Sequence, residues 1–287
     1  MCSGQGRTKA CSGRARGLPA RMTGMAKVAA LAERAVTTLD PLRLRELATH
    51  TSQSVRMAVA ENAHTDDQTV ELLMHDADAV VRIASAGNLA DRPRLQRIAV
   101  ESPDKRVRAR LAATFAYQDD RSLPYEVQAA LASDDFVETR TWIAATTNYL
   151  DLFDLLLRDD DPRVRGACAM NPRTSRAQME TLVTDRFARV RACATATGLT
   201  FPDAEQLLRL AQDRSAGVRW AVLFRVDRPR AAMQMIAEDS DEMNRRHAEM
   251  ALLDNHSIMT PDVEKTVRAG RERAAELCGV WESPPVS

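Results

Sequence analysis

Aromatic residues are scarce in this sequence: they make up 4% of its 287 residues, although 45% of the residues are hydrophobic. Alanine and leucine carry most of the apolar content, which is typical of closely packed helices and not of sheets. No apolar run reaches the about 18 residues that suggest a membrane-spanning helix, and the N-terminus lacks the apolar core of a secretory signal. The composition therefore predicts an all-α, cytoplasmic protein without a membrane partner.

A surplus of charge or of metal-binding cysteines is also missing. Forty lysines and arginines balance forty aspartates and glutamates, so no global field attracts the chain to nucleic acid or to anionic lipid. The five cysteines are odd in number and show no CxxC spacing, which argues against a disulfide framework and against a zinc site. Reduced thiols and no metal are expected.

Catalytic signatures are absent as well. The sequence has no HExxH motif, no GxSxG motif and no glycine-rich phosphate loop. His50 and His75 lie at junctions between repeats, where a hydrogen-bonding role is the simpler interpretation. Cys168 and Cys193 stand in a helix of small residues and are interpreted as core side chains. We therefore predict a non-enzymatic protein with no catalytic residues and no cofactor.

What the sequence does contain is an internal repeat, seen best in the stretch RDDDPRVRGACAMNP from Arg158 to Pro172. An anchor arginine recurs in this setting at Arg56, Arg82, Arg108, Arg140, Arg165, Arg191, Arg219 and Arg245, with steps of 26, 26, 32, 25, 26, 28 and 26 residues. A period in this range is the signature of stacked supersecondary units, each too small to bury a core alone. One elongated repeat domain is the expected architecture.

Each repeat reads as two helical pieces. In six of the eight units, the residues twelve, nine and eight before the anchor are apolar, as at Met179, Leu182 and Val183, and this spacing places them on one helix face. The helix that carries the anchor is almost free of other charges, so we expect it to be buried nearly all round.

An aspartate stands six residues before the anchor in six units, and His50 and Ser102 are the exceptions. Such an aspartate can accept backbone N–H groups or a neighbouring guanidinium. We predict a structural Asp–Arg ladder along the stack, made of Asp76, Arg82, Asp134, Arg140, Asp159, Arg165, Asp185, Arg191, Asp213, Arg219, Asp239 and Arg245. The longer step before Arg140 contains an insertion near residues 118–123, and we expect the stack to be weakest there.

The stretch from Asp159 to Asp185 combines an acidic-Pro turn, the VR pair, a small-residue helix, Asn171-Pro172 and a leucine-rich helix. This pattern resembles the leucine-rich repeat variant family and, more loosely, HEAT-like repeats, over about residues 42–256. The resemblance implies an α-solenoid: a right-handed superhelix of about eight short two-helix repeats, with one α-helix and one 3-10 helix in a unit as one form of the pair. Some relatives carry an N-terminal iron–sulfur cluster, which needs about four thiolates, and only Cys2 and Cys11 lie in that region.

The repeat boundaries give a domain plan for the whole chain. We expect a disordered basic tail over 1–24, an N-terminal capping helix over 25–41 and the repeat solenoid over 42–256. A C-terminal capping helix over 257–280 and a tail over 281–287 complete it. Pro261, which opens the last helical pattern, supports this plan.

Few side chains stand out as candidates for partner binding. Trp142 and Trp220 fall where other units place small or aliphatic residues, and Phe224 follows Trp220 by one turn. Either tryptophan can be a binding anchor or can fill a gap in the core. Arg225 replaces the usual asparagine or threonine and joins Arg228 and Arg230 in a small basic cluster.

A second basic cluster consists of Arg92, Arg94, Arg97, Lys105, Arg106, Arg108 and Arg110. Acidic neighbours dilute it, so a solvated helix surface is the simpler interpretation.

The sequence leaves two functions open. A third is conceivable, but no specific feature of the sequence favours it. The favoured one is a scaffold that binds an unknown protein or peptide on its concave surface, because a solenoid presents a long surface and no catalytic constellation is legible. The alternative is a nucleic-acid-binding protein that resembles the HEAT-like alkylpurine DNA glycosylases. The third is a factor similar to short HEAT-like repeat proteins that act on tetrapyrrole-bearing partners.

Overall fold

The computed structural model describes residues 20–115, 122–197 and 201–253, and this part of the chain contains seventeen α-helices, one 3-10 helix and no strand. The predicted all-α class is therefore confirmed. Two compact units divide the chain after Asn88. The first unit contains α1 (Ala20–Thr37), α2 (Pro41–Leu47), α3 (Gln53–Glu61), α4 (Asp67–Met74) and α5 (Ala79–Ala86).

The second unit contains the remaining helices. They are α6 (Pro93–Val100), α7 (Lys105–Ala112), η1 (Ala113–Phe115), α8 (Tyr125–Ala132), α9 (Val137–Thr146), α10 (Leu150–Leu156), α11 (Pro162–Cys168), α12 (Arg176–Val183), α13 (Ala188–Thr197), α14 (Ala204–Leu210), α15 (Ala216–Leu223), α16 (Arg230–Ile236) and α17 (Glu242–Leu253).

Three expectations need correction against these elements. Both helices of each pair are α-helices, and η1 is the one 3-10 helix in the described residues, so the mixed pair is wrong. The helix expected over 25–41 begins earlier, at Ala20, and ends at Thr37. The compact units divide after Asn88 and not at the insertion, across which α7 and α9 contact each other. The tail over 1–19, residues 116–121 of the insertion and the helix over 257–280 lie outside the described residues.

Short polar side chains start many of the helices. Aspartates cap α2, α4, α5, α7, α11 and α14, each accepting the backbone N–H of the second or third helical residue through its carboxylate. Ser175 does the same at α12, where Gln178 completes a capping box. Each such cap stabilises its helix by about 1 kcal/mol. The caps explain why helices of only two turns begin at fixed residues.

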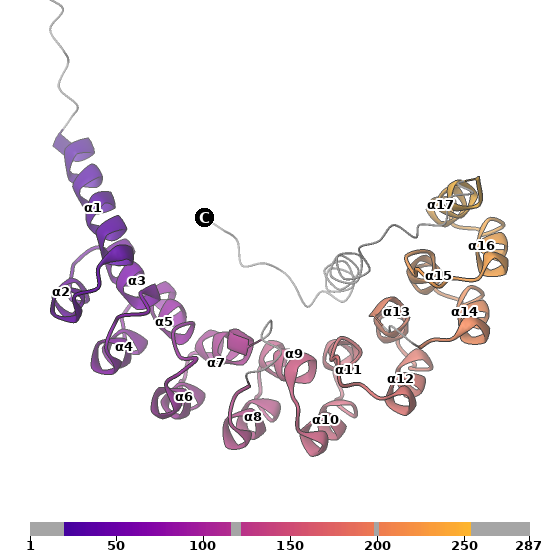
Figure 1. Ribbon diagram of the computed structural model, residues 1–287, viewed down its shortest axis with the longest axis horizontal. Coiled ribbons are helices and arrows are strands. Elements are labelled where there is room, and N and C mark those ends of the chain that lie inside the picture. Colours follow the sequence, from indigo (N-terminus) through magenta and orange to yellow (C-terminus); the bar gives the residue numbers. More distant parts are fainter. Residues whose placement is uncertain (1–19, 116–121, 198–200, 254–287) are drawn as a thin grey trace, which may run out of the picture. The chain divides into compact units, whose positions relative to one another are not determined.

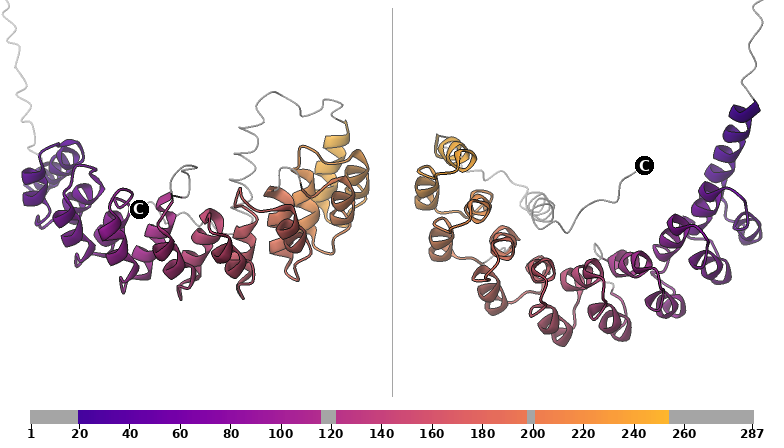
Figure 2. Two further views of the ribbon diagram at one scale, coloured as in Figure 1. Left: turned by 60° about the horizontal axis from the view of Figure 1, so that its bottom comes forward. Right: turned by 180° about the vertical axis from the view of Figure 1, so that it is seen from behind.

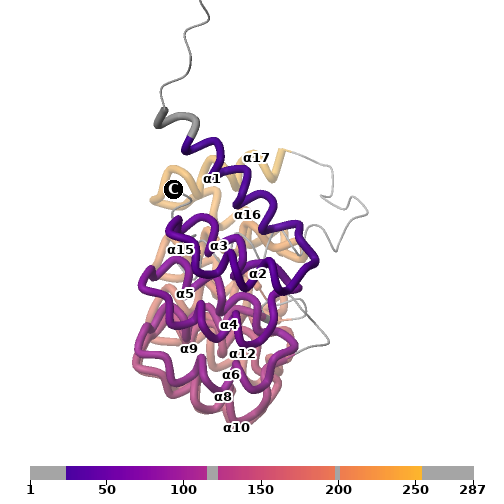
Figure 3. Tube along the Cα trace, turned by 90° about the vertical axis from the view of Figure 1, so that its left-hand side faces the viewer, coloured from indigo at the N-terminus to yellow at the C-terminus, as the bar shows by residue number. Residues whose placement is uncertain are grey.

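The first unit is built on α3. Helix α1 lies alongside α3, and α3 contacts α5 (Figure 3). Buried apolar residues from all five helices form its core, among them Ala35, Leu44, Val55, Leu73 and Val81. Because these residues recur at helical spacing, each helix turns one apolar face inward.

The second unit has its helices in two rows, which Figures 1 and 2 show from three sides. The odd-numbered helices from α7 to α17 contact one another in chain order. The even-numbered helices supply the large core side chains, and Leu95, Leu131, Leu156, Leu182, Leu207 and Ile236 are all fully buried. The trio predicted from offsets of three and four is thus the core face of the even row.

Small residues let the odd-numbered helices approach closely. A Cβ atom on Gly166 of α11 would lie only 3.3 Å from the Sγ atom of Cys193 on α13. Ala167 and Ala194 are fully buried on the same two helices. The small-residue pattern of the sequence therefore marks the row in which helix backbones come nearest to one another. Among the described residues, no helix is both long and apolar enough to cross a membrane.

Candidate functional site

The anchor arginines occupy equivalent places at the start of the odd-numbered helices, and Arg165 on α11 shows the arrangement. Its Nε and Nη2 atoms donate to the two carboxylate oxygens of Asp185, at 2.7 and 3.0 Å. Its Nη1 atom donates to the backbone carbonyl of Asp159 at 2.6 Å. One guanidinium thus ties the turn before its own helix to the turn before the next odd-numbered helix.

The same geometry recurs along both units. The ion pairs are Arg56–Asp76, Arg108–Asp134, Arg140–Asp159, Arg165–Asp185, Arg191–Asp213 and Arg219–Asp239. In each pair the arginine reaches forward to the aspartate of the following repeat. Within its own repeat, each of the eight anchors donates to the backbone carbonyl of the residue six positions earlier. Five of them also donate to the carbonyl five positions earlier.

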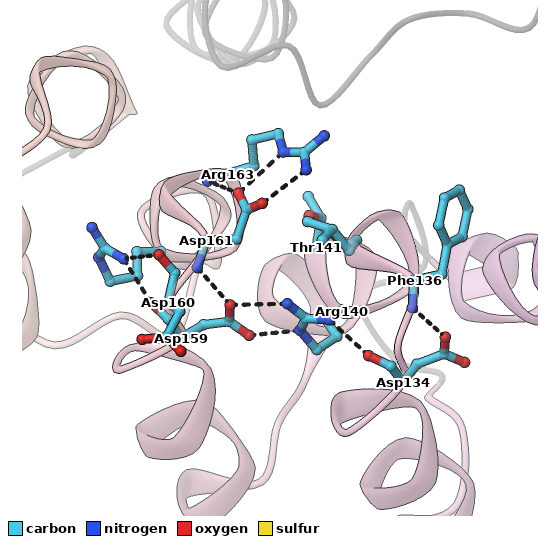
Figure 4. Close-up of polar contacts among 10 residues, drawn as sticks. Asp134, Phe136, Arg140, Thr141, Asp159, Asp160, Asp161 and Arg163 are labelled. Atoms are coloured by element: carbon cyan, nitrogen blue, oxygen red, sulfur yellow. Dashed lines mark hydrogen bonds and ion pairs between the residues drawn. The ribbon is translucent and has the colours of Figure 1, made fainter.

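The aspartates have a second task, which is to close the turn. Asp159 accepts the backbone N–H of Asp161 while it pairs with Arg140, and Asp134 accepts that of Phe136 (Figure 4). The two exceptions keep this task, because His50 Nδ1 accepts the N–H of Ser52 and Ser102 Oγ accepts that of Asp104. His50 is therefore a turn-closing residue.

Burial and hydrogen bonding compete in setting the acidity of the ladder carboxyls. Burial raises the pKa of Asp185, but hydrogen bonds from Arg165 and from the Phe187 N–H hold the net pKa below the usual range. The same balance lowers the pKa values of Asp76, Asp134 and Asp213. At Asp239 the hydrogen bond from Arg219 is the largest cause, and its pKa is lowered furthest. Each carboxyl is thus ionised opposite its arginine near neutral pH.

A second set of contacts, which sequence reasoning missed, joins successive odd-numbered helices. Asn171 follows α11, and its Nδ2 atom donates to the backbone carbonyls of Ala144 and Thr147 at the end of α9. Asn62 and Asn88 make the equivalent contacts in the first unit. The signal was visible in the sequence, since asparagine stands six residues after the anchor in three units.

Arg225 occupies this asparagine position, which corrects its assignment to a partner-binding surface. Its side chain is buried, donates to the backbone carbonyls of Thr195 and Pro202, and pairs with Asp227. Thr197 fills the equivalent place at the end of α13 and donates to the carbonyl of Ala169. Arg225 is therefore a structural residue that bridges helix ends.

Trp220 and Phe224 do lie together. Their ring centroids on α15 are 4.9 Å apart, and Trp220 also meets the His247 ring of α17 edge-on at 4.5 Å. Trp220 is half-buried between these neighbours, whereas Phe224 is 40% exposed. Met243 and Met250 on α17 are each 56% exposed, and their spacing around His247 places all three on one helix face. We call Trp220, Phe224, Met243, His247 and Met250 the α15–α17 surface.

Trp142 is separate from that surface. It lies half-buried on α9, and α11 and α13 stand between α9 and α15 in the row. The structure therefore does not bring the two tryptophans together.

Acidic neighbours offset much of the second basic cluster. Arg106 is paired with Asp104, Arg108 with Asp134 and Asp135, and the Lys105 ammonium lies over the Phe136 ring.

A shallow hollow of about 410 Å³ lies beside the ladder, lined by Asp134, Arg140, Arg158, Asp159 and Asp160 among others. Several of its polar groups already have partners within the fold: Arg140 pairs with Asp159, and Arg158 donates to a backbone carbonyl of α10. The described residues contain no cluster of His, Cys, Asp or Glu that could hold a metal ion. Burial raises the pKa of the free Cys168 thiol far above its usual value, which disfavours the reactive thiolate form. Cys193 is disulfide-bonded, which corrects the expectation of a reduced thiol there.

Comparison with protein-family models and with curated proteins finds no match for this chain.

Proposed function

We propose that the paired helices form an α-solenoid, a right-handed superhelix of about eight two-helix repeats, that acts as a non-enzymatic scaffold for a protein or peptide. The repeated ladder supports the solenoid, because the same arginine geometry joins successive repeats within each unit. A largely buried, bidentate ion pair at six of the junctions fixes the geometry between neighbours. Such an array presents its odd-numbered row as the concave binding surface.

The α15–α17 surface carries the proposal. Phe224, Met243 and Met250 expose large apolar side chains next to the half-buried Trp220. Aromatic residues and methionine are enriched in the cores of protein interfaces, where they supply much of the binding energy. Methionine also adapts its shape to a peptide side chain. A protein or peptide ligand therefore fits this surface better than a phosphate backbone does.

The test compares the proteins that immobilised wild-type protein and a double variant, Phe224→Ala with Met250→Ala, retain from the native host. We expect a partner that the wild type holds and the variant loses, with or without nuclease treatment. Leu150→Ala with Leu155→Ala, two exposed leucines of α10, is the matched control. Equal retention by all three proteins would remove the α15–α17 surface from the proposal.

The nucleic-acid alternative makes a different prediction. Because Arg106 and Arg108 are paired with carboxylates, we expect duplex DNA to bind no tighter than about 10–100 μM at physiological salt, with a shallow salt slope. Fluorescence anisotropy with a labelled duplex measures this. Sub-micromolar binding that weakens in Arg106→Glu with Arg110→Glu would favour the alternative.

A further inference from the structure

Phe187 occupies a place where several other repeats have a capping aspartate, whereas Phe136 stands at the same place before α9. It stands four residues before its anchor Arg191, and its backbone carbonyl accepts the first hydrogen bonds of α13. At the same place, Asp104 caps α7 and Asp161 caps α11 through their carboxylates. A phenylalanine side chain cannot accept a hydrogen bond, so α13 begins without this cap. Its ring is instead 41% exposed.

Arginines surround this exposed ring. The guanidinium carbon of Arg186 lies 5.0 Å from the ring centroid and that of Arg165 lies 5.5 Å from it. Arg214, from the turn before α15, donates to the backbone carbonyl of Arg186 at 3.2 Å. Arg189, two residues after Phe187, has a buried Nε atom without a hydrogen-bond partner. An aromatic face among guanidinium groups results.

These arginines differ from the others around them. Arg163 is paired with Asp161, and the ladder arginines are paired with aspartates. Arg186, Arg189 and Arg214 form no ion pair with any carboxylate of the described residues. Burial lowers the pKa of Arg189, and the nearby charge of Arg163 lowers it further. In a chain with no net charge, these three arginines are a local cluster of positive charge that makes no ion pair, although the carboxylates of Asp161, Asp185 and Asp213 act on them from nearby.

We propose that Arg186, Phe187, Arg189 and Arg214, the arginine–phenylalanine patch, bind a short acidic peptide segment of a partner protein. Carboxylates of the segment pair with the guanidinium groups, which favour bidentate carboxylate contacts. An apolar side chain of the segment packs on the Phe187 ring. The exposed aromatic side chain and the arginines without an ion pair thus meet complementary groups on one ligand.

The neighbouring turns favour a short peptide over nucleic acid. The residue five before the anchor is Arg186 and Arg214 in two successive repeats, but it is Asp135 and Asp160 in the two repeats before them. Asp135 and Asp160 are exposed. An extended phosphate backbone that followed this edge would meet these carboxylates after a few nucleotides, whereas a short acidic segment ends before them.

The patch is distinct from the α15–α17 surface, so either can fail without the other. The test is fluorescence anisotropy of the full-length protein with a fluorescein-labelled peptide in which a Leu-Phe pair is flanked by glutamates on both sides. The same peptide with glutamine in place of glutamate and a labelled oligothymidine are the comparison probes. We expect the protein to bind the acidic peptide in preference to both.

Two variants probe the two halves of the patch. Arg186→Gln with Arg189→Gln and Arg214→Gln should raise the dissociation constant about tenfold or more. The control replaces Arg176, Arg209 and Arg246 with glutamine, which removes the same charge from arginines that pair with a glutamate. Phe187→Ser introduces the residue that stands at this place before α15, where its side chain makes no capping hydrogen bond. It should weaken binding without lowering the melting temperature, because serine is among the residues preferred at the start of a helix.

Four outcomes would overturn the proposal. They are equal weakening by the two triple variants, equal affinity for the glutamine peptide, oligothymidine binding as tight as that of the acidic peptide, and a Phe187→Ser protein that melts earlier but binds unchanged. The first two reduce the patch to non-specific contact, the third makes it a nucleic-acid site, and the last makes Phe187 a structural residue.

Discussion

At the scale of single residues, the anchor arginine does more than its sequence position reveals. The sequence places an aspartate six residues before it, which suggests a pair within one repeat. The structure uses only the backbone carbonyl of that residue and sends the guanidinium to the next repeat, as with Arg165 and Asp185. Which aspartate an arginine contacts depends on how the helices stack in space. The repeat spacing in the sequence does not give this information.

Replacing Arg165 with alanine should lower the free energy of unfolding by about 2 to 4 kcal/mol, because it leaves the largely buried Asp185 carboxylate without its counter-charge. The control is Arg163→Ala in the same helix, whose side chain is 47% exposed and pairs with an aspartate two residues away. Its loss should cost under about 1 kcal/mol. Denaturant melts measure both, and equal costs would show that the ladder adds nothing beyond a surface pair.

The asparagines that bridge helix ends predict a second effect. Asn171→Ala leaves the carbonyls of Ala144 and Thr147 without their donor, so we expect a loss of about 1 to 3 kcal/mol. Asn148→Ala, at an exposed position after α9, should change the stability by less than about 0.5 kcal/mol. Urea melts of the two variants would disprove the bridging role if both left the midpoint unchanged.

The error at Arg225 has the same origin as the missed asparagines. An arginine among basic neighbours reads as a surface charge, yet its register, six residues after Arg219, matches that of Asn171. Its side chain reaches the carbonyl of Thr195 as the asparagine reaches that of Ala144. Register within the repeat was therefore the better predictor of its role than local charge.

At the scale of helices, periodicity predicted most of the architecture. The apolar trio of each repeat became the buried face of the even row, as at Leu182 on α12, and the small-residue pattern became the close row. Boundaries were less accurate: the first helix spans Ala20–Thr37 and not 25–41. The aromatic contact between α15 and α17 could not be foreseen, since His247 is remote from Trp220 in the sequence.

The ladder also predicts how stability depends on pH. Five of its carboxyls have folded pKa values below the usual value near 4, so the unfolded chain binds more protons in acid; they are those of Asp76, Asp134, Asp185, Asp213 and Asp239. Their contribution is complete above about pH 5 and is lost as the pH falls through the folded pKa values. Urea melts from neutral to acidic pH should therefore show unfolding free energy that falls steadily below about pH 5.

A variant identifies the groups responsible for that dependence. Asp239→Asn removes the carboxyl whose pKa is lowered most. It should make the unfolding free energy fall less steeply in acid (the acid limb of the curve) and should lower the stability at neutral pH. Glu180→Gln, which removes an exposed carboxylate on α12, should leave the limb as steep as in the wild type. An acid limb unchanged by Asp239→Asn would assign the dependence to other groups.

At the scale of the whole chain, the division into units is a testable property. The boundary after Asn88 leaves α1 to α5 together, whereas a cut after Asp120 separates α7 from α9, which contact each other. We expect fragments 1–88 and 89–287 to retain helical circular dichroism. Fragments 1–120 and 121–287 should retain less. The reverse order would place the weak interface at the insertion after all.

Each paired anchor arginine binds an aspartate of the following repeat, so the ion pairs all run in the same direction along the chain. The stretch from Asp159 to Thr184 contains one acceptor and one donor for these pairs. Asp159 accepts from the anchor of the preceding repeat, and Arg165 donates to the aspartate of the following repeat. An in-frame duplication of that stretch would leave both new junctions with a matched donor and acceptor, so the chain can lengthen in evolution without compensating substitutions. His50 in the first repeat has no carboxylate to accept such a donor, although its ring still closes the turn.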